Sequence, residues 1–384
     1  MAIGAVAASS ASASQLVTPA VAIPDAVLAG ATVARPRTAS SAAFSNPAGL
    51  TLFHDKEASS SLAMPIMHSS VEATAPEGYE NERFGAGFAP EFGIAFDGPG
   101  GWHFGVATYG SVGSSFKSEA EPAVGVTSDF YSELSVANIA VIVARDLTDK
   151  LSVGASVSAL VGWTRLRYTT DIPYAYALAG PGVQAIVGAR YQATEALAFG
   201  LGVRLPGKVW ADGDMHLPDG TGEDVDLEID MPAQIFVGTN VAVTKSVSID
   251  LYGRWTDTSS FGDSWFRFDK TPQGDMPLVP HANDEFRIGA GVEYAMTRRV
   301  TVGFGIGYAD SIIGDKGMSP LLFDSAELKA GVGFSYAFDR FTIDMMVGND
   351  FKGERHVKPE DALVFPGRYD LSGHVVAIGL RTTL

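Results

Sequence analysis

The sequence contains no cysteine and no hydrophobic segment long enough to cross a bilayer as a helix. Without cysteine there is no disulfide framework and no thiolate chemistry. The mostly apolar run at 136–144 is far shorter than the about 20 residues that a membrane-spanning helix needs. If the chain lies in a membrane, it must therefore cross it as a β-barrel.

Charged residues are also few, and basic ones are scarcer than acidic ones. They make up 18% of the 384 residues, and the net charge is −17. Because nucleic acid phosphates require Lys and Arg, this balance argues against a nucleic acid partner. Hydrophobic residues make up 46%, yet the mean hydropathy is only +0.13. A barrel explains this combination, because only every second side chain of its strands faces lipid.

From about residue 56 onward, apolar residues alternate with polar residues or glycine, which predicts β-strands. In the stretch 326–338, one face reads Ala326, Leu328, Ala330, Val332, Phe334, Tyr336 and Phe338. Similar alternation occurs at 197–205, 247–255, 285–294 and 300–308. In 132–145 both faces are apolar, so the pattern does not show which face points inward, and strand limits within 257–283 also stay open.

A soluble β-sandwich would show this alternation too, but two further features favour a membrane barrel. Several apolar faces end in an aromatic residue, as an interfacial girdle requires: Trp163, Tyr191, Trp255, Tyr294 and Tyr308. Short connections, such as 244–246 and 297–299, alternate with long ones expected near 71–82, 112–130, 169–181, 207–224, 257–283, 311–324 and 351–370. The pattern predicts an all-β fold, a transmembrane antiparallel β-barrel of about 14 strands over residues 51–384.

The N-terminal residues lack this alternation. Residues 1–15 are small and mostly apolar and include Ala11-Ser12-Ala13, which is similar to a signal-peptidase site, although no Lys or Arg precedes Arg35. They are either the remnant of a signal peptide or a flexible N-terminus. Residues 16–50 are rich in Ala and Ser and form a separate N-terminal segment.

Asn46-Pro47-Ala48, just before the first expected strand, resembles a motif of the outer-membrane long-chain fatty acid and aromatic hydrocarbon transporter family, the FadL type. Thr108-Tyr109-Gly110, Asp230-Met231-Pro232 and the strand pair at 284–308 follow in the order and spacing of that family. The last residue, Leu384, departs from the aromatic residue that is usual there. The resemblance covers nearly the whole chain. It implies a fourteen-stranded barrel in the outer membrane of a Gram-negative bacterium, with a hatch formed by residues 16–50 in its lumen.

The resemblance also assigns site residues. It makes Asn46, Pro47 and Ala48 the hatch motif, and it places an inward kink and a lateral opening at Tyr109 and Gly110 of the third strand. Glycine permits such a kink because it adopts backbone angles that other residues avoid, although an ordinary glycine at a barrel corner is the alternative. The implied function is passive uptake of small hydrophobic molecules, which leave through the opening in the wall.

Charged residues on the polar strand faces are expected to point into a polar lumen: Arg190, Arg204, Asp250, Arg254, Glu285, Arg287, Glu293, Glu327, Lys329, Asp344 and Arg381. One interpretation is a salt-bridge network that anchors the hatch, because buried charges must be paired. The other is that Arg204, Arg254, Arg287 or Lys329 receives the carboxylate of a ligand. Arg165 and Arg167, on the apolar parity at the loop end of a strand, either contact lipopolysaccharide phosphate or are simply solvated.

The sequence shows no enzyme constellation. Its seven His residues are scattered without metal-ligand spacing, and no glycine-rich phosphate loop joins a strand to a helix. We therefore expect no metal, no cofactor and no catalysis, and a monomer that meets outer-membrane lipid, lipopolysaccharide and, during insertion, the barrel-assembly machinery. A general polar porin, a structural barrel and a lipid-modifying barrel enzyme are the alternatives. Whether the ligand is a fatty acid or an aromatic hydrocarbon stays open.

Overall fold

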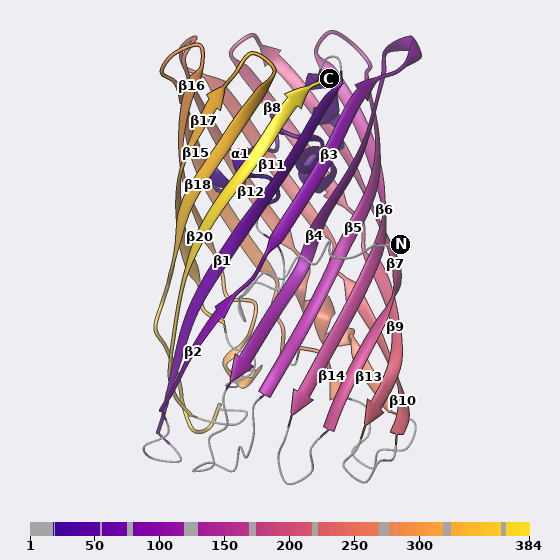
Figure 1. Ribbon diagram of the computed structural model, residues 1–384, viewed down its shortest axis with the longest axis vertical. Coiled ribbons are helices and arrows are strands. Elements are labelled where there is room, and N and C mark those ends of the chain that lie inside the picture. Colours follow the sequence, from indigo (N-terminus) through magenta and orange to yellow (C-terminus); the bar gives the residue numbers. More distant parts are fainter. Residues whose placement is uncertain are drawn as a thin grey trace.

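In the computed structural model, the described strands close into an antiparallel barrel that crosses the membrane 14 times, which confirms the predicted fold (Figure 1). The structure describes residues 18, 20–53, 56–74, 80–118, 130–168, 174–216, 222–268, 276–279, 281–317, 324–361 and 366–384. Strand β20 (Gly367–Thr383) pairs with β1 (Glu57–Ala73) along its whole length and so closes the barrel. None of the described helices has the length and hydrophobicity of a membrane-spanning helix.

Some barrel strands are single elements and others consist of two shorter ones. The single ones are β1, β4 (Trp102–Ser118), β5 (Phe130–Asp146), β6 (Leu151–Tyr168), β7 (Tyr174–Thr194), β16 (Val300–Ala309), β17 (Glu327–Ala337), β18 (Phe341–Lys352) and β20. The composite ones are β2 (Glu80–Ala86) with β3 (Ala89–Asp97), β8 (Leu197–Arg204) with β9 (Gly207–His216), β10 (Gly222–Met231) with β11 (Gln234–Ala242), β12 (Val247–Thr256) with β13 (Trp265–Phe268), and β14 (Met276–Pro277) with β15 (Glu285–Ala295). A short strand, β19 (Arg355–Val357), pairs with β20 beyond the end of β18. Pro206 and Pro232 stand at two of the interruptions, where a residue without an N–H cannot join the ladder.

The short connections gather at the end of the barrel where the chain terminates (Figure 1). They include the 3-10 turn η2 (Pro99–Gly101) and the turns at 147–150, 195–196, 243–246, 296–299 and 338–340. Outer-membrane barrels carry their short turns on the periplasmic side, so we call this end the periplasmic rim. The long connections at the other end include the 3-10 turns η4 (Thr258–Asp263) and η5 (Asp315–Gly317).

Several segments expected to be loops belong to strands, so the predicted limits of these loops were wrong. Residues 174–181 belong to β7, and most of 207–224 belongs to β9 and β10. In β10 the inward residues Val225, Leu227 and Ile229 are buried, while Asp224 and Asp226 point outward and are exposed. The alternation is therefore inverted where the barrel leaves the hydrocarbon layer, since the outer face there meets water or polar headgroups.

Strand β5 explains the stretch in which both faces are apolar. Ile139 and Val141 point outward and are 47% and 61% exposed, as lipid-facing side chains must be. Val136 and Ile142 point inward and are fully buried. Both faces are apolar because one meets lipid and the other meets a packed interior.

The interior of the extracellular half is apolar, which corrects the expectation of a polar lumen. Its buried side chains form one group, which we call the extracellular apolar cluster; it includes Val136, Leu160, Leu178, Val209, Leu227, Ile229, Phe261 and Ile313. Most of the inward charges lie instead around the N-terminal segment. The lumen is thus divided into an apolar extracellular part and a periplasmic part where charges are paired.

The periplasmic half is filled by residues 20–53, which we call the hatch segment (Figure 1). It contains α1 (Ile23–Val27), α2 (Ala39–Ser45) and the 3-10 helix η1 (Pro47–Leu52). Thr38 begins α2 with a capping box, in which its side chain accepts from Ser41 N and Ser41 Oγ accepts from Thr38 N. The predicted segment was 16–50; the predicted N-terminal stretch, residues 1–15, lies outside the described residues.

Candidate functional site

The Asn-Pro-Ala motif joins the hatch segment to itself and to the wall. Asn46 Nδ2 donates to Val33 O at 2.8 Å and to Ala189 O of β7 at 3.1 Å, and its Oδ1 accepts from Ala48 N at 3.2 Å. Pro47 occupies the first position of η1, where a missing N–H is harmless. Asn46 is fully buried. The motif therefore acts as a fixed corner between α2, η1 and the barrel wall.

Glycines on the inner wall make room for this corner. A Cβ at Gly154 of β6 would lie 2.6 Å from the carbonyl carbon of Pro47, and one at Gly188 of β7 would overlap Asn46 Oδ1. A second set on β16 and β17, including Gly303 and Gly333, would clash in the same way with Val27 of α1. These wall glycines thus leave the space into which the hatch segment packs.

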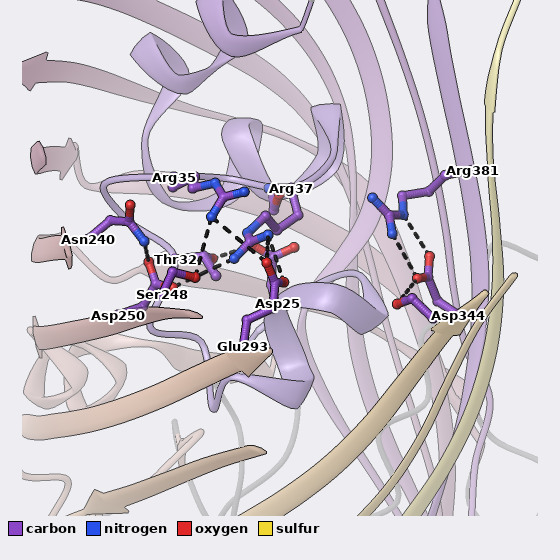
Figure 2. Close-up of polar contacts among 12 residues, drawn as sticks. Asp25, Thr32, Arg35, Arg37, Asn240, Ser248, Asp250, Glu293, Asp344 and Arg381 are labelled. Carbon is purple, nitrogen blue, oxygen red and sulfur yellow. Dashed lines mark hydrogen bonds and ion pairs between the residues drawn. The ribbon is translucent and has the colours of Figure 1, made fainter. Parts of the chain in front are cut away.

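Arginines of the hatch segment pair with carboxylates of the wall (Figure 2). Arg37 Nη1 lies 2.8 Å from Glu293 Oε2, and Arg37 Nη2 lies 3.6 Å from Asp250 Oδ2. Asn240 Nδ2 donates to Asp250 Oδ1 at 2.8 Å. Arg35 lies 3.8 Å from the same Glu293. These contacts tie the hatch segment to β12 and β15.

Asp25 of α1 is a buried carboxyl group that forms no ion pair with the residues that the structure describes. Its side chain accepts a hydrogen bond from Thr32 Oγ1, so it bridges α1 and the turn that follows (Figure 2). Burial raises the pKa of Asp25 to about 7, although the Thr32 hydrogen bond and the charge of Arg37 act in the opposite direction. The protonation of one hatch residue therefore changes near neutral pH.

Three of the four predicted ligand-carboxylate residues, Arg254, Arg287 and Lys329, belong to one network of ion pairs. Arg254 Nη2 lies 2.5 Å from Glu285 Oε1, and Arg287 lies 3.2 Å from the other oxygen of that carboxylate and 2.7 Å from Glu327. Arg254 Nη1 also donates to Thr18 O at 2.9 Å. This arrangement matches the predicted salt-bridge network, because each cation is close to a carboxylate.

Lys329 stands at the edge of that network, between Glu327 at 3.5 Å and Asp350 at 3.4 Å. Arg204 is separate from it. Its Nη2 donates to Phe44 O at the C-terminal end of α2, and its guanidinium carbon lies 5.3 Å from the centre of the Phe44 ring. Arg204 therefore holds α2 against the wall.

Tyr109 is also a hatch contact. Its side chain is fully buried, its ring packs edge-on at 5.9 Å from that of Phe44, and its hydroxyl donates to Ala43 O at 3.3 Å. Tyr109, one of the two residues at which the resemblance implies a kink, thus packs an inward aromatic side chain against α2.

Directly after Gly110, the register of β4 against β5 shifts by one residue at Ser111. Such a bulge leaves a residue outside the ladder and bends the strand. Ser111 O accepts from the backbone N of Thr18 at 2.9 Å, and Ser111 Oγ accepts from Asn138 Nδ2 at 2.7 Å. The bulge therefore fastens the chain just before the hatch segment to the wall.

The ladder on the other side of β4 ends at the same place. Strand β3 pairs with β4 only from Asp97↔His103 to Phe92↔Thr108, and in the described residues no pairing joins β2 to β4 beyond it. The break lies beside Gly110, where the resemblance placed the opening.

A mostly apolar cavity of about 170 Å³ lies behind this break, between the hatch segment and the wall; we call it the wall cavity. It reaches Tyr109 and Gly110 on β4, Thr18, and small apolar residues of β1, β3 and α1. Lys329, Asn349, Asp350 and His374 provide its polar end. Arg204, Arg254 and Arg287 are not among its lining residues.

Sequence reasoning missed the most important hatch cations and the bulge. Arg35 and Arg37 are the only basic residues before Lys56, which was a usable signal. Ser111 carried no such signal, because a bulge is visible only in the register of neighbouring strands. Glu91 of β3, buried and hydrogen-bonded by Ser40 and Ser61, was also missed.

The comparisons with known proteins agree with this geometry. The model of the family described as outer membrane protein transport protein (OMPP1/FadL/TodX) matches residues 4–383. The fold is similar to that of a FadL homologue from Pseudomonas aeruginosa, with 15% identity and a TM-score of 0.82 over 96% of this chain and 99% of that one. No curated protein matches the sequence significantly.

Two toluene transporters are also similar in fold. TodX of Pseudomonas putida is 16% identical, with a TM-score of 0.73 over 95% of this chain and 99% of its own. TbuX of Ralstonia pickettii is 18% identical, with a TM-score of 0.72 over 96% of this chain and 99% of its own. With a family model that spans almost every residue and a barrel of the same architecture, this chain belongs to the OMPP1/FadL/TodX family of outer-membrane channels for hydrophobic compounds.

Proposed function

We propose that apolar molecules enter from the extracellular side, pass the extracellular apolar cluster, reach the wall cavity and leave between β2 and β4 into the bilayer. The single observation that carries this route is that the wall cavity touches Gly110, where the β3–β4 ladder ends. The hatch segment, tied at Asn46 and Arg37, would block the direct path to the periplasm.

The energetics favour this route over a path through water. An apolar ligand gains about 25 cal/mol for each Å² of surface that leaves water. From the extracellular apolar cluster to the lipid, the ligand would remain among apolar groups, whereas a periplasmic exit would expose it again. The same apolar interior speaks against a general polar porin, which needs a hydrated lumen.

The relatives support a compact hydrophobic ligand without deciding its class. TodX and TbuX are described as toluene transporters, and the Pseudomonas aeruginosa relative as a FadL homologue. The polar end of the wall cavity offers Lys329 to a carboxylate, although Lys329 already lies near Asp350. Of the four predicted ligand residues, Lys329 is the one whose position supports that role.

The remaining expectations are part of the same proposal. Arg165 and Arg167 are exposed near the end of β6, on the outward face next to the loops, where lipopolysaccharide phosphates would lie. We propose that they contact these phosphates and that the chain works as a monomer without catalytic activity. As for any outer-membrane barrel, insertion would depend on the barrel-assembly machinery.

The route is tested by replacing Gly110 with Val, which adds a branched side chain at the break and favours a regular strand. Uptake of radiolabelled toluene and of a radiolabelled long-chain fatty acid should both fall, while heat-modifiable migration shows that the barrel is inserted. Gly253→Val in β12 is the control, because a Cβ there would lie 3.5 Å from Val237, in ordinary contact. Wild-type uptake by the Gly110 variant would show that the kink is only structural.

A further inference from the structure

A second cavity lies at the periplasmic rim and plays no part in the route above. Its volume is about 240 Å³, and it is enclosed by α1 and the inner faces of β16 and β17. Four arginines line it: Arg37 of the hatch segment, Arg298 and Arg299 of the β15–β16 turn, and Arg381 of β20. We call it the periplasmic pocket.

The charge of this pocket is opposite to that of the chain. The chain carries a net charge of −17, but Glu293 is the only acidic residue among those that line the pocket. Asp344 and Asp339, which pair with Arg381 at 2.7 Å and Arg299 at 3.1 Å, do not line it. Arg298 makes no ion pair with any described residue. A local excess of positive charge in an acidic protein favours an anion.

The arginines also keep donors for such an anion. Arg381 donates to Asp344 through Nε and Nη2, which leaves Nη1, and Figure 2 shows this pair standing apart from the Arg37 contacts. Arg299 uses Nη2 for an exposed Asp339, a pair that is weak in water. Guanidinium groups with free N–H edges bind carboxylates in two-point contacts.

The rest of the pocket is not polar. Ile23, Pro24, Val27 and Leu28 of the hatch segment form one side of it. An inorganic anion would leave this surface in contact with water, whereas an anion with a ring or a short chain would cover it. Gly303, Ser335 and Thr301 of the lining point into the barrel, so this part of the pocket lies on the inner face of the wall.

We propose that the periplasmic pocket binds a small amphipathic carboxylate, such as an aromatic or short alkyl acid, from the periplasm. The carboxylate would meet Arg298, Arg299 and Arg381, and the apolar part would lie against α1. This site is separate from the wall cavity and does not depend on the lateral exit route.

The test is calorimetric titration of the full chain in detergent micelles at neutral pH, with benzoate as the probe. Acetate has the same charge without the ring, and toluene has the ring without the charge. Benzoate should bind at one saturable site, and Arg298→Gln combined with Arg299→Gln should weaken it by about tenfold or more, as loss of charge-assisted hydrogen bonds implies. Both residues are exposed turn residues, so the variant should fold.

The matched control is Arg340→Gln, an exposed arginine in the neighbouring turn that does not line the pocket. Benzoate affinity should be unchanged there, and acetate should bind at least about tenfold more weakly than benzoate to the wild type. Absence of saturable benzoate binding, or equal affinity in the double variant, would overturn the site. Equal affinity for acetate would overturn its amphipathic character. Uptake through the wall is measured separately, so failure of one proposal is distinguishable from failure of the other.

Discussion

Gly154 of β6 and Pro47 of the hatch segment are in such close contact that a Cβ on Gly154 would lie 2.6 Å from the Pro47 carbonyl carbon. No side chain fits at this distance unless the backbone of the hatch segment moves. The hatch motif therefore packs against the wall only because position 154 has no side chain.

The first prediction follows from this contact. Gly154→Val should displace η1 from the wall without unfolding the barrel, because the strand ladder on both sides of Gly154 is regular. Hydrogen–deuterium exchange of peptides within residues 39–52 should rise by about tenfold or more, as loss of a well-packed contact implies. Gly253→Val should leave that exchange as in the wild type. Equal protection in both variants would show that the hatch segment does not rest on Gly154.

The second prediction concerns the carboxylate that two arginines share. Glu285→Gln leaves Arg254 and Arg287, both buried, without much of their compensation. Breaking a buried pair in this way costs about 3–5 kcal/mol. The free energy of unfolding, measured with urea and Trp fluorescence in micelles, should fall by that amount. Asp339→Asn removes an exposed partner of Arg299 and should change it by less than about 1 kcal/mol. Similar losses in the two variants would contradict the network.

The third prediction concerns pH. The pKa of Asp25 in the docked hatch segment is about 7, raised from an ordinary value of 3.8 by burial. An undocked Asp25 would ionise first, so docking is strongest below about pH 4 and weakens as the pH rises to about 7. Above that pH both states are ionised and the penalty, on the order of 4 kcal/mol, stays constant.

The measurement is amide exchange of the hatch segment between pH 5 and pH 8, corrected for the intrinsic exchange rate. Protection should fall over this range in the wild type and stay level in Asp25→Asn, which cannot ionise. Arg37 and Glu91 also act on Asp25, but an effect through either of them would persist in the Asn variant. A pH response that persists in Asp25→Asn would assign it to another group.

The fourth prediction tests the extracellular apolar cluster. Leu227→Gln puts an amide group on an inward, fully buried position of β10. Because an apolar ligand loses the contact of a Leu side chain there, worth about 2 kcal/mol, uptake of toluene should fall by about thirtyfold. The neighbouring Asp226→Asn changes the outward face and should leave uptake unchanged. A Leu227→Gln channel that is inserted and fully active would show that ligand does not pass this cluster.

The sequence predicted the barrel because its strands obey a simple rule where they cross lipid. Phe304 and Ile306 alternate with glycines, and both are exposed on the outer surface. The rule failed where the apolar face of a strand points into the barrel and the polar face points outward. A loop was expected over residues 207–224, yet Asp224 lies on the outward face of a strand whose inward face is apolar.

Part of the candidate site could also be predicted from the sequence. Asn46 and Gly110 were found because the resemblance supplied their positions; Asn46 contacts the wall at Ala189 O, and Gly110 lies beside the end of the β3–β4 ladder. The partners of Arg37 could not be predicted, since Asp250 and Glu293 are more than 200 residues away in the chain and meet it only through barrel closure. The strand alternation showed that both carboxylates point inward, but it did not show which residues they contact.

The bulge at Ser111 has a consequence for the open edge of β4. Where the β3–β4 ladder stops, β4 presents an open strand edge, and such edges are the places where strands of other molecules add. Close to this edge, Thr18 donates its backbone N–H to Ser111 O at 2.9 Å. The N-terminal part of the chain thus already bonds to the backbone beside this edge, and whatever withdraws Thr18 must supply another donor to Ser111 O.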